Sequence, residues 1–249
     1  MLRALLLDMD NTLCDTHRAV DTAKIQLARH VGQRFSKETS LNGDAFASAF
    51  VTGIYREWSD SQRSAYLPII ERQGEEVFRK KLIQDLLAEQ HISAITDALA
   101  GDLLQVFESA RITAFDFYPG IADFLSRIRD TLTLVVITNG PEFSQLPKIA
   151  AVNLEYYVDH IIVGGQESEQ KPARSIFEKA LQLANCQAEE AVHIGDSFSA
   201  DIVGASNSNI KTIWVRHEQK TDSVSTIRAC YTVDHPREIP ALVDQMIAG

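Results

Sequence analysis

Six short apolar runs constrain the fold of this chain more than any other feature. They lie at residues 2–8, 132–138, 160–165, 191–196, 212–216 and 230–234. Most are continuously apolar rather than alternating, which is typical of strands buried on both faces of a parallel sheet. Stretches with helical periodicity lie between them, at residues 121–130, 173–184 and 199–207. This alternation predicts an α/β fold in which a Rossmann-like, doubly wound parallel sheet carries helices on both faces.

The long interval between the first two runs predicts an inserted domain. About 120 residues separate these runs, whereas a crossover between parallel strands needs only about 10–12. Within the interval, residues 19–31, 75–90 and 94–110 carry apolar side chains at spacings of three and four, as amphipathic helices do. We therefore expect an α/β core at residues 1–15 and 114–249 and an all-helical cap domain at residues 16–113. Because the chain leaves the core directly after Asp8 and Asp10, the cap is expected above the carboxyl ends of the strands.

The charge and cysteine content argue against several classes of protein. With 24 basic and 34 acidic residues the net charge is −10, which disfavours a broad positive face for nucleic acid or an anionic membrane. Cys14, Cys186 and Cys230 include no CxxC pair, so neither a disulfide framework nor a zinc site is indicated. No apolar run approaches the ~20 residues of a membrane span or forms the core of a signal peptide. We expect a cytoplasmic protein that holds any anionic substrate by local groups.

Polar side chains follow four of the predicted strands. The carboxyl ends of parallel strands meet at one edge of a sheet, where open α/β sheets bind their ligands. Any one of these residues could be a turn or cap former, but four groups at the same edge indicate a site. The groups are Asp8, Asp10 and Thr12 after the first run, Thr138, Asn139 and Gly140 after the second, Gln170, Lys171 and Pro172 after the third, and Gly195, Asp196, Ser197 and Asp201 after the fourth.

The chemistry of these groups suits phosphoryl transfer. Asp8, Asp10 and Asp196 offer the hard oxygen ligands that Mg²⁺ prefers. Lys171 can neutralise a carboxylate or a phosphoryl oxygen, while the Thr138 hydroxyl and the backbone N–H groups after it can donate to oxyanions. A carboxylate nucleophile, a second carboxyl group as acid and base, a hard metal and anion donors together make a phosphoryl-transfer site.

The motifs that carry these residues resemble those of a known superfamily. The stretches DMDNTL (8–13), ITNG (137–140), QKPARSIF (170–177) and GDSFSAD (195–201) are similar, in this order, to the four motifs of the haloacid dehalogenase superfamily. The helical insertion resembles the type 1 cap of that superfamily. Within it, the core motifs are most similar to those of the N-acylneuraminate-9-phosphatases and of bacterial nucleotidase-like phosphatases.

The resemblance implies a role for each site residue. Asp8 is expected to be the nucleophile that forms an aspartyl phosphate. Asp10 is expected to protonate the leaving alkoxide and later to deprotonate water, so its pKa should lie nearer the operating pH than that of a free aspartate. Mg²⁺ would bind the side chains of Asp8 and Asp196 and the backbone carbonyl of Asp10, with Asp201 nearby or bound through water. The transferring phosphoryl group would be held by Thr138, Lys171 and the N–H groups of Asn139 and Gly140.

The resulting hypothesis is a Mg²⁺-dependent phosphomonoesterase that acts on a small phosphorylated metabolite. The core resemblance favours a sugar phosphate such as N-acylneuraminate 9-phosphate, with a nucleoside monophosphate as the second choice. Two alternatives remain open. One is a haloacid dehalogenase that cleaves a carbon–halogen bond, although the additional carboxylates would repel a carboxylate substrate unless a cation offset them. The other is a binding or regulatory protein that keeps the fold without catalysis.

Overall fold

The chain divides into two compact units. A computed structural model describes residues 1–36, 41–92, 95–217 and 226–248. One unit comprises Met1–Thr16 and Asp116–Gly249, and the other comprises His17–Phe115. The limits expected from the sequence, after residues 15 and 113, lie one and two residues away from these. Residues 37–40, 93, 94, 218–225 and 249, which fall within the predicted domains, lie outside the described residues.

The first unit is built on one six-stranded parallel sheet, which confirms the predicted fold class. Five of the six apolar runs contain one strand each, and β5 begins one residue before the run at 212–216. The strand order is β3-β2-β1-β4-β5-β6, so the order reverses direction between β1 and β4, the place where open α/β sheets bind ligands. The strands are β1 (Ala4–Leu7), β2 (Thr133–Thr138), β3 (His160–Val163), β4 (Ala191–Gly195), β5 (Lys211–Val215) and β6 (Tyr231–Val233).

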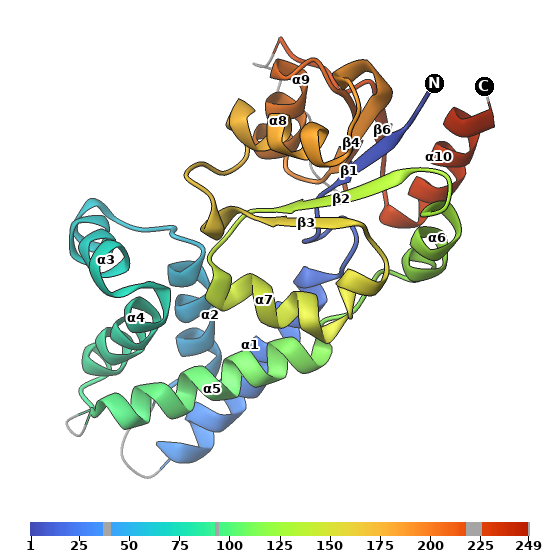
Figure 1. Cartoon of the computed structure of the whole chain (residues 1–249). Helices are drawn as coiled ribbons and strands as arrows, with labels where there is room; N and C mark the ends of the chain where they lie inside the picture. Colours follow the sequence, from blue (N-terminus) through green and yellow to red (C-terminus); the bar gives the residue numbers. More distant parts are fainter. Residues whose placement is uncertain (37–40, 93–94, 218–225, 249) are drawn as a thin grey trace. The chain divides into compact units, whose positions relative to one another are not determined.

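Helices cover both faces of this sheet (Figure 1). On one face, Leu6 and Val135 of the strands pack with Phe177 of α8 and Ala205 of α9 in one buried cluster. On the other face lie α6, α7 and α10, and Arg127 of α6 pairs with Asp244 of α10. The helices are α6 (Ile121–Ile128), α7 (Glu142–Ala151), α8 (Arg174–Leu183), α9 (Gly204–Asn207) and α10 (Ile239–Ala248). Short 3-10 turns occur at Leu154–Tyr156, Gly164–Gln166, Ala188–Glu190 and Pro236–Glu238.

Two helices of this unit lie within the ranges predicted from the sequence, and the other helices do not match a prediction in this way. Residues 121–130 and 173–184 contain α6 and α8, whereas 199–207 forms a π-helical turn (Phe198–Val203) followed by α9. No helix was predicted at α7 or α10. Three of the four buried residues of α7 are polar, namely Ser144, Gln145 and Lys148, the fourth is Ile149, and the helix contains Pro147. A mostly polar buried face has little hydrophobic periodicity to detect, so the sequence pattern there does not indicate a helix.

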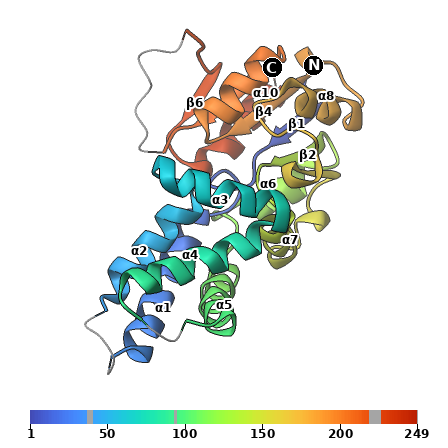
Figure 2. The same cartoon turned by 90° about the vertical axis from the view of Figure 1, so that its left-hand side faces the viewer.

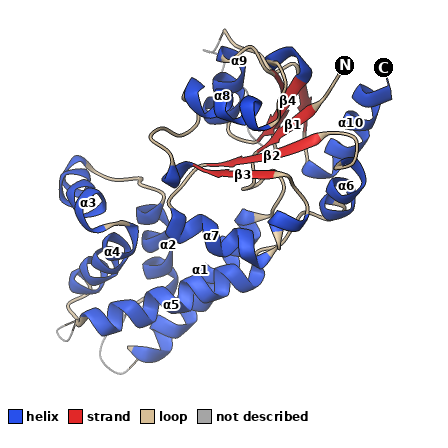
Figure 3. Ribbon diagram, viewed as in Figure 1, coloured by secondary structure: helices blue, strands red, loops and turns tan. Residues whose placement is uncertain are grey.

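Among the described residues of the second unit, every regular element is a helix (Figure 3). Its helix α4 packs against α2, α3 and α5 (Figure 2). Aromatic side chains fill its interior, with the rings of Phe50 and Phe107 edge to face at 5.1 Å. The predictions over 19–31, 75–90 and 94–110 fall on α1, α4 and α5, while α2 and α3 were not predicted; residue 94 is not described. The bounds are α1 (Thr16–Arg34), α2 (Gly43–Ile54), α3 (Asp60–Gln73), α4 (Glu75–Glu89) and α5 (Asp97–Ala114).

The two chain segments that lead into and out of the helical unit are hydrogen-bonded to each other. The Asp15 N–H donates to the Asp116 carbonyl at 3.0 Å, and the Tyr118 N–H donates to the Leu13 carbonyl at 2.9 Å. The insertion therefore begins and ends at one place on the sheet unit. Among the described helices, none combines the length and apolar character needed to cross a membrane.

Candidate active site

Asp8 stands at the point where the strand order reverses. It follows β1 directly, and its N–H donates to the carbonyl of Ile194 on β4 at 2.9 Å. This bond continues the ladder between β1 and β4 by one residue, so the backbone of Asp8 is as fixed as the strand before it. The side chain is almost completely buried because the neighbouring strand ends surround it.

A buried lysine joins Asp8 to Asp201. The Lys171 Nζ atom lies 2.6 Å from Asp8 Oδ1 and 2.7 Å from Asp201 Oδ1, and the lysine side chain is only 2% exposed. Asn139 anchors the backbone of this lysine: its side-chain amide donates to the Lys171 carbonyl at 2.8 Å and accepts from the Lys171 N–H at 3.0 Å. The loops after β2 and β3 are thereby tied together, and the two carboxylates raise the pKa of Lys171 although burial opposes this.

Asp201 is held as a carboxylate by three donors. His193 Nε2 lies 2.9 Å from its Oδ1 atom, which Lys171 also contacts, and the Ser197 N–H donates to Oδ2 at 2.9 Å. Burial opposes ionisation, but Lys171 and His193 outweigh it and lower the pKa of Asp201 to about 2. Burial also lowers the pKa of His193. Asp201 is therefore an ionised group whose position fixes that of Lys171.

Gly195 leaves the space that Asp201 occupies. A Cβ atom added at Gly195 would lie 2.3 Å from Asp201 Cγ, far inside van der Waals contact. We expect Gly195→Ala to displace the Asp201 carboxylate and with it Lys171, lowering the free energy of unfolding by about 1–3 kcal/mol together with any activity at this site. Thermal melting and turnover measure the two effects. Gly101→Ala is the matched control, because its new methyl group would meet only Lys80 Cε at 3.7 Å; equal behaviour of the two variants would contradict the prediction.

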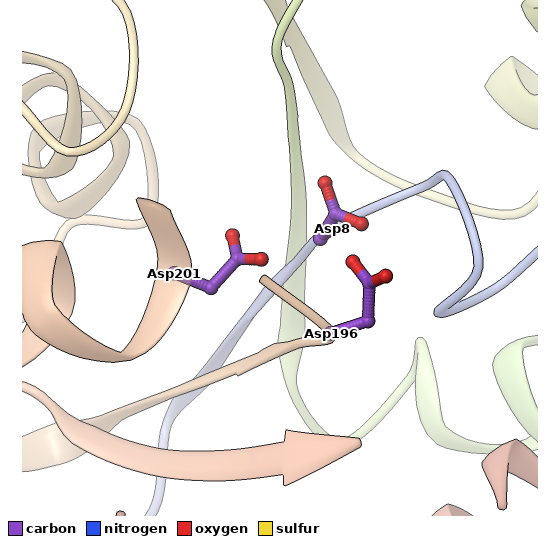
Figure 4. Close-up of side chains that lie close together, drawn as sticks. All are labelled: Asp8, Asp196 and Asp201. Atoms are coloured by element: carbon purple, nitrogen blue, oxygen red, sulfur yellow. The ribbon is translucent and has the colours of Figure 1, made fainter. Parts of the chain in front are cut away.

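Three carboxylates gather where a cation would fit. Oxygens of Asp8, Asp196 and Asp201 lie within 4.8 Å of one another, and the three groups turn toward the same space (Figure 4). Asp8 Oδ2 is buried and has no hydrogen-bond partner among the described residues. Burial raises the pKa of Asp8 well above its usual value, and burial together with Asp201 raises that of Asp196 to about 7. A hard divalent cation would relieve both the desolvation and the repulsion, so the donor set fits such an ion.

The Asp10 side chain points to a different set of partners. Lys148 Nζ lies 2.8 Å from Asp10 Oδ1, Gln145 Nε2 lies 2.8 Å from Oδ2, and the Thr16 hydroxyl also donates to Oδ1. Burial opposes ionisation here too, but Lys148 and these hydrogen bonds lower the pKa of Asp10 to about 2. The expectation of a pKa nearer the operating pH is wrong for this arrangement, because Lys148 faces Asp10 and favours its ionised form.

The expected phosphoryl-binding residues lie at the end of β2. Thr138 is its last residue and is fully buried, and its hydroxyl oxygen accepts a hydrogen bond from Gln145 Nε2. Gly140 has φ +113°, which favours glycine. Its N–H donates to Gln170 Oε1 at 2.9 Å, so the Gln170 side chain has to move before this N–H can bind a phosphoryl oxygen.

The structure thus brings Asp8, Lys171, Asp196 and Asp201 into one cluster, with Asp10 and Thr138 joined beside them through Gln145. Sequence reasoning missed Gln145, Lys148 and His193. For His193 the signal was a histidine inside an otherwise apolar run. For the other pair it was a polar i, i+3 spacing just after the Thr-Asn-Gly turn, which places both side chains on one face once a helix is assumed.

Several known proteins are similar to this chain in sequence or in fold. Residues 2–209 match the family model described as haloacid dehalogenase-like hydrolase. The chain is 25% identical over 248 residues to N-acylneuraminate-9-phosphatase of Mus musculus, covering 98% of this chain and 95% of that protein. It is 27% identical over 220 residues to pyrimidine 5'-nucleotidase PynA of Streptococcus pneumoniae, with coverages of 84% and 82%. A solved structure of 2-haloacid dehalogenase from Pseudomonas syringae is similar with a TM-score of 0.69 and 21% identity, covering 99% of this chain and 100% of that one; this last likeness concerns the fold alone.

Proposed function

The chain belongs to the haloacid dehalogenase-like hydrolase family, and we propose that it works through an aspartyl phosphate on Asp8 with the help of Mg²⁺. Like the N-acylneuraminate-9-phosphatases that it matches over almost their whole length, it is a phosphomonoester hydrolase. The proposed substrate is a small phosphorylated metabolite of the cytoplasm. The proposed catalytic residues are Asp8, Asp10, Thr138 and Lys171, the substrate-binding residues are Thr138, Asn139, Gly140 and Lys171, and the metal-binding residues are Asp8, Asp10, Asp196 and Asp201.

One observation carries this proposal: a single buried ammonium group binds one oxygen of Asp8, while the other oxygen has no partner among the described residues. A structural ion pair buried in a core would satisfy both carboxylate oxygens, because an unpaired one is costly. An oxygen left over at the edge of the sheet where ligands bind supports its use on a ligand. Lys171 keeps the carboxylate oriented and would neutralise a phosphoryl oxygen beside it.

The proposed reaction has two steps. In the first, an Asp8 oxygen forms a bond to phosphorus while the bond to the leaving oxygen breaks, and that oxygen takes a proton from Asp10. In the second, water loses a proton to Asp10 and attacks the phosphorus of the aspartyl phosphate, which releases phosphate and restores the Asp8 carboxylate. The ionised Asp10 described above is the form that accepts the proton in the second step, whereas the first step uses the protonated carboxyl group.

The charges of the site support a divalent ion. When ionised, Asp8, Asp10, Asp196 and Asp201 carry four negative charges, and Lys148 and Lys171 offset two of them. We propose that Asp8 and Asp196 would hold Mg²⁺ by their side chains and Asp10 by its backbone carbonyl. Bound there, the ion would neutralise negative charge that otherwise repels a phosphate dianion from Asp8. Both Asp201 oxygens already accept hydrogen bonds, which supports contact through water for this residue.

The substrate class follows from the relatives rather than from the sheet unit. The mouse relative is described as an N-acylneuraminate-9-phosphatase and the streptococcal one as a pyrimidine 5'-nucleotidase. We propose a sugar phosphate such as N-acylneuraminate 9-phosphate first and a nucleoside monophosphate second. We propose that the helical unit, which resembles the type 1 cap of the superfamily, selects between these two classes of substrate.

A panel of phosphorylated metabolites tests the proposal. The kcat/KM of each is measured with Mg²⁺ and with excess EDTA, and p-nitrophenyl phosphate is included as a generic monoester. We expect turnover of at least one sugar phosphate or nucleotide, and its loss with EDTA and return with Mg²⁺. Full activity on a haloacid in EDTA would point instead to a dehalogenase, and no turnover of any monoester would point to a binding protein.

A further inference from the structure

Helix α7 sends two polar side chains to the ends of the strands. Gln145 and Lys148 are polar residues of α7, yet they are only 2% and 5% exposed. The Lys148 Nζ atom contacts Asp10 Oδ1 and Gln145 Oε1 at 2.8 and 2.9 Å. Gln145 Nε2 in turn contacts Asp10 Oδ2 at 2.8 Å and the Thr138 hydroxyl oxygen. One lysine and one amide therefore link the proposed acid/base residue to the proposed phosphoryl-binding threonine.

Lys148 determines which way the Gln145 amide faces. An ammonium group can only donate, so the amide atom that it contacts must be the carbonyl oxygen. The amide nitrogen then faces Asp10 and Thr138, and its two hydrogens match the two acceptors that lie there. The opposite orientation would place an N–H group against Lys148 and an oxygen against the Asp10 carboxylate. The charge on Lys148 thus fixes the direction of every hydrogen bond in this group.

The direction of these bonds matters most at Thr138. Its hydroxyl oxygen accepts from Gln145, so that bond does not use the hydroxyl hydrogen. A hydroxyl has one hydrogen to donate, and in this arrangement it is kept for an acceptor other than Gln145. A phosphoryl oxygen beside Thr138 is such an acceptor.

We infer that Lys148 and Gln145 are positioning residues for phosphoryl transfer: Lys148 orients the Gln145 amide and the Asp10 carboxylate, and Gln145 directs the Thr138 hydroxyl hydrogen toward the phosphoryl group. The inference rests on the proposed function. It differs from a purely structural role in what it predicts. A network that only holds the fold would, when broken, change stability and slow every substrate alike.

Gln145→Glu tests the direction of the Thr138 hydroxyl. The new side chain has the same shape, but it offers no N–H to Thr138 and instead accepts the hydroxyl hydrogen. Calorimetry with inorganic phosphate in the presence of Mg²⁺ measures binding without turnover. We expect the Kd for phosphate to rise at least about tenfold, the loss expected for one hydrogen bond to a charged group. Gln182→Glu, on the exposed side of α8, adds the same charge elsewhere and is expected to leave the Kd within about twofold.

Lys148→Met tests the hold on Asp10. Removing the ammonium group frees both Asp10 and the Gln145 amide to turn. The kcat for alkyl phosphates, whose leaving oxygen needs a proton, should fall about 100-fold, the lower end of what a general acid contributes. The kcat for p-nitrophenyl phosphate, whose leaving group is stable without a proton, should fall less than about tenfold. Lys148→Arg keeps the charge and should recover part of the loss on alkyl phosphates.

Control variants distinguish the loss of positioning from a loss of folding and from a failure of the proposed function. Lys179→Met removes a half-exposed lysine that pairs with Glu167 and should change neither rate, while thermal melting shows which variants fold. If Lys148→Met fails to fold, Lys148→Arg and Gln145→Glu carry the test. Equal rate losses on both substrate types with unchanged phosphate binding by Gln145→Glu would overturn the inference. A wild-type protein that hydrolyses no monoester would overturn the proposed function instead, while phosphate calorimetry would still test the Thr138 arm.

Discussion

Asp8→Asn protein is expected to show no measurable turnover of any phosphate monoester. A neutral amide cannot form the aspartyl phosphate, and losing the nucleophile of a covalent enzyme costs roughly 10⁴-fold or more in kcat. The fold should persist because the side chain keeps its shape and the amide oxygen can still accept from Lys171. The measurement is kcat on the best substrate of the panel, together with thermal melting.

The matched control for this variant is Asp244→Asn. Asp244 also forms an ion pair, with Arg127 at 2.9 Å, but its side chain is 46% exposed, so its loss should leave turnover unchanged. Residual activity in pure Asp8→Asn protein above about 1% of the wild type, with the KM of the wild type, would show that Asp8 is not the nucleophile.

Lys171→Met is expected to damage both activity and stability. It removes the one cation that contacts Asp8 and Asp201 in the described part of the chain, leaving two buried carboxylates close to each other. Breaking a buried ion pair by removing one partner costs about 3–5 kcal/mol of unfolding free energy, whereas the exposed pair broken in Lys179→Met should cost less than about 1 kcal/mol. Added Mg²⁺ should recover part of the stability, because it supplies positive charge to the same carboxylates.

Tryptophan fluorescence can assign this loss to the sheet unit. The chain has two tryptophans: Trp214, on β5, donates to the Asp196 carbonyl at 2.9 Å, and Trp58 packs with Tyr66 and Phe78 in the helical unit. In a Trp58→Phe background, denaturant unfolding followed by fluorescence reports on Trp214 alone. An unfolding midpoint unchanged by Lys171→Met would contradict the stabilising role of Lys171.

The strands were predictable because each is a short apolar run. All six were identified from the sequence alone, and the central ones are completely buried, as Leu5 and Val135 show. The family resemblance, drawn from residues at the ends of these strands, is confirmed by a match over residues 2–209. Parallel strands bring their ends together wherever they lie in the chain, which is why Asp8, Lys171 and Asp196 could be expected near one another.

Helices α3 and α10, neither of which was predicted from the sequence, lack a clear periodic apolar face. Helix α3 has Tyr66 as its one fully buried residue among those described and contains Pro68, so its pattern resembles that of a loop. In α10, apolar residues occupy most positions, and only Ile239 and Val243 are buried. Packing against neighbours, rather than periodicity, determines such helices.

The contacts that Lys148 and His193 make in the site were also not predicted, because hydrophobic periodicity does not indicate them. Lys148 contacts Asp10 from a distant part of the chain, and His193 on β4 contacts Asp201 in the π-helical turn that follows the strand; no spacing rule links either pair. The pKa of Asp10 depends on these partners, so its direction could not be inferred from Asp10 itself. The ends of the strands could be derived from the sequence, whereas the side chains that approach them from α7 could not.

The hydrogen bonds between the segments on either side of the insertion have a consequence for folding. Residue Ala4 pairs with both Thr133 and Ala191, so β1 leaves the ribosome long before either partner strand exists. Contacts so distant in sequence form slowly because a long loop must close first. In the helical unit, α4 packs against α2, α3 and α5, which are near it in the chain, so this unit can form early, and its folding would bring the segments around Asp15 and Asp116 together. We therefore expect the folded insertion to shorten the loop that must close before β1 pairs with its partner strands. Substitutions that destabilise the helices of the insertion would then delay assembly of the sheet, although no strand residue is changed.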